Sequence, residues 1–506
     1  MLTWLNRFQR RRVEPTALPG PPFLDERNAA LRGDFDRAVD GYFHAYEDMA
    51  RRGEVPALIG RPRVAAFLLN HHGRSQMADD AIRIEAAATL AEDLVNSDTN
   101  FDAALVALQY KARLQDAWRA RHGSTGRLYL GEDWTRNIGH IASIQHLLML
   151  QRLGLASWQR IVVVARRSQV ANLALLQQFG AELDIVTDPK EVARLAPRVA
   201  GDGLRFFDLL GWKDHQPVAI AELGNFVESL WAANRQPICR LDPSDLDYGR
   251  DAMARIGLPA DASFVCFHVR EDGYHNDKGY SARSSSIESY LPAMQRIVDE
   301  GHWVVRLGDP SMSPLPRRDR VIDYANCGHR DPLVDVYLCA QCHFFVGTTS
   351  GLMFVPHLFG VPALITNYMF VFAAPPLGRT SRFLPQLVRQ QGRDLNFAEM
   401  MSARTMRACY SNHGAADLGL SFVANSPDEI DDAVREMSIL HPPPDVRRRL
   451  ADDCADEIPA MAGSLGFLNP PSDFQRRFQA LYPAAHRNGN AMIGRDFVDQ
   501  HQRLLP

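Results

Sequence analysis

Long apolar runs, cysteine and lysine are all scarce in this chain of 506 residues. No stretch approaches the roughly 18–20 consecutive apolar residues of a membrane span, and the first residues, MLTWLNRFQRRRVEP, lack the apolar core of a signal peptide. Seven cysteines spread over so long a chain predict a reduced, cytoplasmic protein with buried thiols, not a disulfide framework.

The charge is nearly balanced. The chain has 56 Lys and Arg against 60 Asp and Glu, a net charge of −4, and only four of the basic residues are lysines. It therefore lacks the basic field with which nucleic-acid binders neutralise phosphates, and we expect no nucleic-acid partner. Hydrophobic residues make up 46% and charged residues 23%, as in globular proteins, and the length suggests about three structural units.

The two ends of the chain carry no α/β pattern. Residues 1–24 are proline-rich and aperiodic, which predicts a mobile arm. Its Trp4, Leu5 and Phe8, beside four arginines, would allow a weak peripheral contact with an anionic inner membrane, although one basic turn binds marginally and a solvated tail is the favoured alternative. Residues 25–120 have a helical pattern, and 441–506 read as a polar helical tail.

Between the ends, short apolar runs alternate with helical segments. Runs such as 161–164 and 264–269 are typical of strands buried on both faces of a parallel sheet. The alternation predicts an α/β fold with two doubly wound Rossmann-like domains, over 121–240 and 258–440. Ligands of such sheets lie at the carboxyl ends of the strands, so we expect the chemistry in loops 131–140, 268–285, 307–312 and 347–351.

Three of these loops carry candidate functional residues. His268 and Arg270 end an apolar strand, where an arginine suits bidentate phosphate binding, and a structural ion-pair network is the alternative. The turn Gly347–Gly351 offers backbone N–H groups and hydroxyls to an anion, or else simply caps a helix. His140 begins a helix, where the dipole favours the neutral, basic imidazole, or else it packs or caps.

Other chemical signatures are weak. Cys339-Ala-Gln-Cys342-His343 matches the haem-attachment pattern, but it spans a helix end and a core strand, so we interpret it as two buried thiols and a capping histidine. No zinc spacing, Walker motif or Ser-His-Asp signature is visible. We therefore expect neither a metal nor a cofactor.

Residues 265–367 resemble a family of bacterial glycosyltransferases of the GT-B type, linked to surface-polysaccharide synthesis. The resemblance rests on HVREDGY (268–274), SSSIESY (284–290), VRLGD (305–309), IDYA (322–325) and FFVGTTSGLMFVPHLFGVPALITN (344–367), and VANSPDEI (423–430) also fits. The loop RNIGHIA (136–142) extends it less specifically. HVR also looks like the His-x-Arg motif of α1,6-fucosyltransferase-like enzymes, in which the arginine holds the donor diphosphate. Glu271 and Asp272 replace the basic residue expected there, so the donor, GDP-fucose included, stays open.

The resemblance implies a GT-B-like, metal-independent enzyme that moves a sugar from a nucleotide-sugar donor, its substrate, to a surface-glycan acceptor. The proton acceptor would be His140 or Asp133, and the acceptor-side loop would include Arg136, Asn137 and Gly139. The expected donor-binding residues are His268, Arg270, Arg306, Gly308, Asp309, Thr348, Thr349, Ser350 and Gly351. A nucleotide-sugar epimerase, a polysaccharide pyruvyl transferase and a non-catalytic scaffold are the alternatives.

Overall fold

The structure is a computed structural model. It describes residues 24–51, 68, 72, 75–96, 101–206, 209–212, 216–219, 224, 227–228, 230–231, 237–271, 283–369, 374–378, 380–402, 405, 415, 418–442 and 491–505. The expected N-terminal arm, except Leu24, and most of the expected C-terminal tail lie outside these residues. The chain divides into two units, one of residues 1–124 with 193–202 and one of residues 125–192 with 203–506. The domain boundaries drawn from the sequence stay predictions.

The first unit is helical. It contains α1 (Leu24–Leu31), α2 (Phe35–Arg51), α4 (Gln76–Asn96), α5 (Phe101–His122) and the second part of α8 (Pro189–Asp202). Ala38, Tyr42 and Tyr46 follow one another at helical spacing on α2, and all three are buried in the core of this unit. Ala200 of α8 belongs to the same core, and Arg119 of α5 pairs with Asp202 at 2.8 Å.

The second unit begins with a parallel four-stranded sheet of order β3-β2-β1-β4. Its strands are β1 (Arg127–Leu130), β2 (Arg160–Val164), β3 (Leu183–Val186) and β4 (Gly203–Leu204). The connections contain 3₁₀ helices η2 (Glu132–Trp134), η3 (Arg167–Gln169) and η4 (Gly180–Glu182), with α6 (Ile138–Arg152), α7 (Leu173–Gln177) and the start of α8. Most of α6 is buried, in agreement with its largely apolar sequence.

A second parallel sheet in the same unit has seven strands in the order β16-β12-β11-β10-β7-β8-β9. Its central strands are β7 (Phe264–His268), β10 (Phe345–Thr348) and β11 (Ala363–Tyr368), and every residue of these three is buried. The other strands are β8 (Trp303–Arg306), β9 (Val321–Ile322), β12 (Arg382–Pro385) and β16 (Met492–Ile493). The predicted α/β fold with parallel sheets is thereby confirmed.

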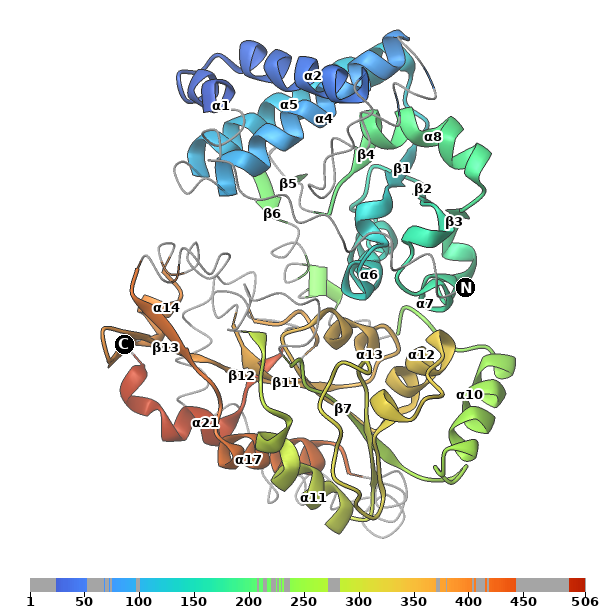
Figure 1. Cartoon of the computed structure of the whole chain (residues 1–506), viewed down its shortest axis with the longest axis vertical. Coiled ribbons are helices and arrows are strands. Elements are labelled where there is room, and N and C mark those ends of the chain that lie inside the picture. The colour runs from blue at the N-terminus through green and yellow to red at the C-terminus, as the bar shows by residue number, and fades with distance from the viewer. Residues whose placement is uncertain are drawn as a thin grey trace, which may run out of the picture. The chain divides into compact units, whose positions relative to one another are not determined.

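The helices of this sheet form two groups on either side of it (Figure 1). One group pairs α11 (Leu291–Asp299) with α17 (Pro427–Leu440), and the other joins α10 (Pro243–Arg255), α12 (Pro332–Gln341) and α13 (Val355–Leu358). The remaining short helices are η7 (Ile287–Tyr290), η8 (Tyr324–Asn326), η9 (Gly351–Phe354), α14 (Phe397–Met400), α21 (Arg495–Gln500) and η11 (Gln502–Leu504).

Two small antiparallel sheets complete the unit. They are β14-β13-β15, of Arg393–Asp394, Leu387–Gln390 and Leu420–Val423, and the hairpin of β5 (Leu209–Trp212) and β6 (Gln216–Ala219). Strand β16 lies within the expected helical tail, so that segment is extended at Met492–Ile493 and adds an edge strand beside β12. Among the described helices, none combines the length and apolar composition that crossing a bilayer requires.

The cap of α17 yields a stability prediction. Ser426 Oγ accepts a hydrogen bond from the Glu429 backbone N–H, and the Glu429 carboxylate accepts one from the Ser426 N–H, so the two residues form a capping box. Ser426→Ala removes one of these bonds and should lower the free energy of unfolding by about 1 kcal/mol. Urea denaturation measures the change. Ser421→Ala, at an exposed strand position, is the control, and an equal effect of both changes would contradict the capping role.

Candidate functional site

The two motifs predicted to bind the donor lie side by side at the carboxyl edge of the seven-stranded sheet. Strands β7 and β10 are parallel neighbours whose register sets Gly347 opposite His268. Just beyond the strands, the backbone N–H of Arg270 donates to Thr348 Oγ1 at 3.1 Å. Arg270 is only 7% exposed. The pairing of two strands distant in sequence thus joins the arginine to the hydroxyl-rich turn.

The three hydroxyls of that turn differ in what they do. Thr348 Oγ1 accepts from Arg270, while Thr349 Oγ1 donates to the Asn367 carbonyl at 3.1 Å and accepts from the Met369 N–H at 3.2 Å. Ser350 is 8% exposed, and its Oγ has no hydrogen-bond partner among the described residues. The threonines therefore build the turn, and the Ser350 hydroxyl is the one that a ligand could engage.

His268 is held as a neutral imidazole. Burial lowers its pKa to about 4, the nearby Arg306 and Arg270 charges act in the same direction, and the Leu307 carbonyl and Asp309 oppose the shift. Because a carbonyl can only accept, His268 Nδ1 donates to Leu307 O, at 3.3 Å. The lone pair is therefore on Nε2.

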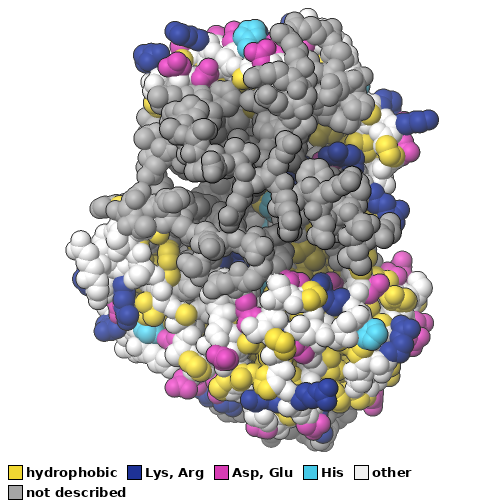
Figure 2. All heavy atoms as spheres, in the orientation of Figure 1, with side chains coloured by type: hydrophobic (Ala, Val, Ile, Leu, Met, Phe, Trp, Pro, Cys, Tyr) yellow, Lys and Arg dark blue, Asp and Glu magenta, His cyan; other side chains and the backbone are white. Residues whose placement is uncertain are grey.

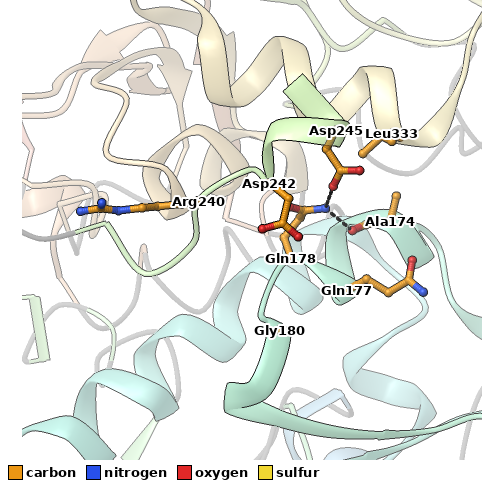
Figure 3. A pocket seen from close by; sticks show the side chains of 8 residues that line it. All are labelled: Ala174, Gln177, Gln178, Gly180, Arg240, Asp242, Asp245 and Leu333. Atoms are coloured by element: carbon orange, nitrogen blue, oxygen red, sulfur yellow. Dashed lines mark hydrogen bonds between the residues drawn. The ribbon is translucent and has the colours of Figure 1, made fainter. Parts of the chain in front are cut away.

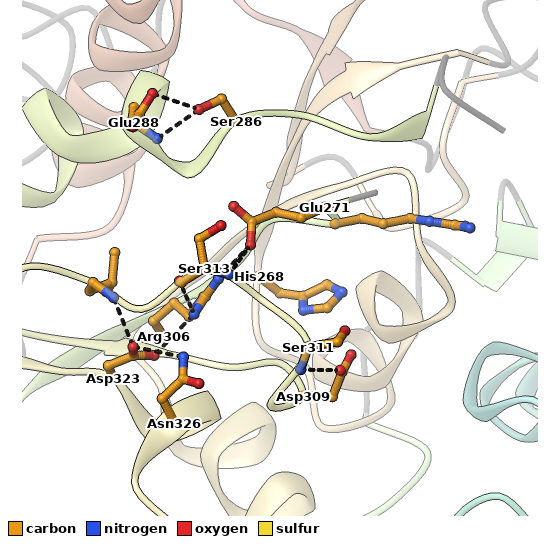
Figure 4. Close-up of polar contacts among 12 residues, drawn as sticks. His268, Glu271, Ser286, Glu288, Arg306, Asp309, Ser311, Ser313, Asp323 and Asn326 are labelled. Atoms are coloured by element: carbon orange, nitrogen blue, oxygen red, sulfur yellow. Dashed lines mark hydrogen bonds and ion pairs between the residues drawn. The ribbon is translucent and has the colours of Figure 1, made fainter. Parts of the chain in front are cut away.

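Asp309 lies next to the His268 ring (Figure 4). Its Oδ1 accepts from the Ser311 N–H at 2.9 Å, whereas Oδ2 is buried and has no hydrogen-bond partner among the described residues. Gly308 precedes it in a tight loop, where a Cβ would collide with the Met312 sulfur. His268 and Asp309 together present two acceptors, which suits a ligand that carries hydroxyl donors.

Arg306 serves the framework of the site. Its side chain has 0% exposure and pairs with Glu271 at 3.2 Å and with Asp323 at 3.1 Å (Figure 4). Its Nη1 also donates to the Ser313 carbonyl at 3.1 Å, and Glu271 accepts from the Ser313 N–H at 2.6 Å. The sequence predicted that Arg306 binds the sugar donor. In the structure, however, the Arg306 guanidinium has no exposed surface with which to bind it. It ties together the loops that follow β7 and β8.

The predicted acceptor-side loop is held by its acidic residues. Glu132 pairs with Arg166 at 2.6 Å and with Arg136 at 3.3 Å, and Asp133 Oδ2 accepts from the Phe206 N–H at 2.7 Å. Asn137 is exposed and stands at the N-cap of α6 without a side-chain capping bond. Since the Asp133 carboxylate positions the chain at Phe206, it is less suited than His140 to accept a proton.

His140 is fixed in one orientation by two contacts. Its Nδ1 donates to the Asp133 carbonyl at 2.6 Å, and its ring stacks on Phe206 with centroids 3.5 Å apart and planes inclined by 6°. Burial lowers the pKa of His140 below its usual value of 6.5, and the hydrogen bond to Asp133 opposes this. The neutral ring thus carries its lone pair on Nε2, as a proton acceptor requires.

Two glycines bring the His140 loop onto the turn that follows β10. A Cβ placed on Gly139 would lie 2.5 Å from Gly351 Cα, and one on Gly351 would lie 2.8 Å from Gly139 N. Real side chains do not tolerate such distances, so only glycine at both positions allows this backbone contact. Of the predicted residues, the structure therefore brings together Gly139, His140, Ser350 and Gly351, with Arg270 joined to the same turn.

A buried charged cluster that sequence reasoning missed ties the same helices together. Glu228 Oε1 lies 2.9 Å from His357 Nε2 on α13 and 3.6 Å from His146 Nε2 on α6. Despite burial, which opposes the shift, the two histidines lower the pKa of Glu228 to about 2. Glu228 and His146 belong to no recognisable motif, and His357 lies within the segment 344–367 without having been singled out. Only their isolated polarity within apolar segments could have drawn attention to them.

A pocket of about 340 Å³ lies apart from these residues (Figure 3). Gln178 donates across it to Asp245 at 2.9 Å. Its lining residues are Ala174, Gln177, Gln178, Gly180, Arg240, Asp242, Asp245 and Leu333, none of which was predicted to act.

On the face that Figure 2 shows, described acidic and basic side chains are interspersed. Within the described part of the chain, no group of three or more His, Cys, Asp or Glu is arranged to hold a metal ion.

The sequence matches no protein-family model, and no curated protein matches it. A glycosyl transferase family 9 structure from Veillonella parvula is similar over 47% of this chain and 79% of that one, with 12% identity and a TM-score of 0.31. The iron-containing dodecameric glycosyltransferase TibC from enterotoxigenic E. coli covers 51% of this chain and 60% of its own, with 17% identity and a TM-score of 0.31. TibC in complex with ADP-D-beta-D-heptose covers 58% and 77%, with 13% identity and a TM-score of 0.32. At these scores, function has to be argued from the site itself.

Glu228 predicts a pH dependence of stability. A carboxyl whose pKa is lower in the folded state stabilises the fold above its unfolded pKa, near 4.5, and this contribution disappears as the pH falls toward 2. Wild type should therefore lose more stability than Glu228→Gln between pH 5 and 3, by about 1–3 kcal/mol. Thermal unfolding over this range is the measurement, and Glu300→Gln, at an exposed position, is the control. Parallel curves for wild type and Glu228→Gln would refute the role of the cluster.

Proposed function

We propose that this protein is a metal-independent glycosyltransferase of the GT-B type, which moves a sugar from a nucleotide-sugar donor to a surface-glycan or polysaccharide acceptor. The observation that carries the proposal is the contact of Gly139 with Gly351. It sets a neutral histidine, His140, next to a turn that is hydrogen-bonded to a nearly buried arginine. A proton acceptor beside an anion-binding group is what transfer from a diphosphate leaving group requires.

The donor would lie on the seven-stranded sheet. The Arg270 guanidinium would bind its diphosphate, and the Ser350 hydroxyl would donate to a phosphate oxygen. His268 Nε2 and Asp309 Oδ2 are acceptors, so they would bind hydroxyls of the ribose or the sugar and would repel phosphate. This division of the site into a donating half and an accepting half matches the two ends of a nucleotide sugar.

In the reaction, the acceptor hydroxyl oxygen would form a bond to the anomeric carbon while the bond from that carbon to the diphosphate oxygen breaks. The hydroxyl proton would pass to His140 Nε2. The negative charge that develops on the departing diphosphate would be stabilised by Arg270. No cofactor enters this scheme, in which the nucleotide sugar is a substrate, and the protein acts by positioning and by fixed charges.

Arg270 gives the first test of donor binding. Arg270→Gln should weaken binding of the cognate nucleoside diphosphate by about 10- to 100-fold, because a charge-assisted bond in a closed site is lost. Calorimetry of ADP, GDP and UDP identifies the cognate nucleotide and measures the change. Arg255→Gln, at an exposed position on α10, is the matched control. Unchanged affinity with an unchanged melting temperature would exclude the phosphate role of Arg270.

His140 gives the test of catalysis. His140→Gln keeps a polar side chain but cannot take the proton, so kcat should fall by roughly 10²–10⁴-fold, with little change in donor affinity. Because the pKa of His140 is lowered, the wild-type rate should stay constant through pH 6.5 and decline only at lower pH. His329→Gln, on an exposed segment, controls for loss of a histidine. A His140→Gln enzyme with the wild-type kcat would make this residue purely structural.

The assay also separates the alternative reactions. Sugar transfer to a glycan, epimerisation of the nucleotide sugar and pyruvyl transfer give different products by mass spectrometry. Turnover to an epimer, or to a pyruvylated glycan, would replace the proposal.

A further inference from the structure

Residues 283–285 lie against the candidate site. The Ser285 N–H donates to the Arg270 carbonyl at 2.8 Å, and Arg283 Nε donates to the Thr349 carbonyl at 3.2 Å. One hydrogen bond thus anchors the segment to the strand end that carries Arg270, and the other anchors the Arg283 side chain to the hydroxyl-rich turn. Arg283 is half-buried there.

This anchoring fixes the orientation of the guanidinium. The group is planar, so a hydrogen bond at Nε sets the plane in which the two Nη atoms lie. The Thr349 carbonyl lies one residue from Ser350, whose buried hydroxyl has no hydrogen-bond partner among the described residues. Arg283 therefore reaches the turn at the point where the chain already offers a donor to a ligand.

The charges at this edge of the sheet leave room for a second cation. Arg306 is neutralised by Glu271 and Asp323 and is 0% exposed, so it adds nothing to a ligand. A diphosphate carries more than one negative charge, and a single guanidinium would leave part of it uncompensated. Arg283 is hydrogen-bonded to the same turn as Arg270.

We propose that Arg283 is a second phosphate-binding residue, which acts with Arg270 to hold the two phosphates of the donor. This inference rests on the proposed function. It assigns one arginine to each side of the diphosphate, and the bidentate geometry of a guanidinium, not only its charge, is what binds.

The test compares nucleotides that differ by one phosphate. For Arg283→Gln, affinity for the cognate nucleoside diphosphate should fall by about 10- to 100-fold, and affinity for the monophosphate by clearly less, since one phosphate can still use Arg270. Arg283→Lys keeps the charge but cannot bind in the bidentate manner, so it should also bind the diphosphate more weakly than wild type. Calorimetry with the full-length chain measures both, and Arg255→Gln is again the control.

The outcomes separate this inference from the function. If Arg270→Gln loses affinity while Arg283→Gln binds the diphosphate like wild type, Arg283 has no part in binding and the proposed function stands. An equal loss for monophosphate and diphosphate would mean that Arg283 only shapes the turn. If wild type binds none of the nucleoside diphosphates, both proposals fall. Should Arg283→Gln lower the melting temperature, Arg283→Lys decides, and wild-type affinity in that variant overturns the inference.

Discussion

The backbone contact between Gly139 and Gly351 is the constraint on which the rest of the site depends. It leaves no room for a side chain on either residue, so the start of α6 and the turn after β10 are held in one position. The Glu228 cluster fastens the same pair of elements about two helical turns further along, through His146 on α6 and His357 on α13. A backbone contact and a buried polar cluster therefore fix the same geometry by different physical means.

Around this contact, some polar residues hold the candidate site together, and others are those that we propose to contact the donor. Glu132, Asp133, Thr348, Thr349 and Arg306 spend their hydrogen bonds on backbone or on opposite charges within the protein. Their partners allow these polar groups to lie at the edge of a buried sheet, since an unpaired buried charge is costly. The other donors and acceptors of the site can then give binding specificity, while the partnered groups keep the fold stable.

The sequence predicted the parallel strands well, because runs such as 161–164 and 264–268 are apolar on both faces and need no tertiary information. It also drew attention to the two turns that we propose as the donor site, since polar residues directly after buried strands are a local signal. It could not assign Arg306 correctly, because Glu271 and Asp323 neutralise it only after the loops have folded. Arg283 and Glu228 were not predicted, because their contacts form only once distant segments have folded together. Strand β16 was not predicted, because a strand of two residues shows no periodicity.

Helix α8 is divided between the two units, and this affects how the chain folds during synthesis. The helical unit contains residues 1–124 but also 193–202, and these late residues supply Ala200 to its core and Asp202 to Arg119. A ribosome would thus have to release most of the four-stranded sheet before the helical unit could be completed. The nascent helices would wait with part of their apolar surface exposed, a state in which chaperones bind and aggregation competes with folding.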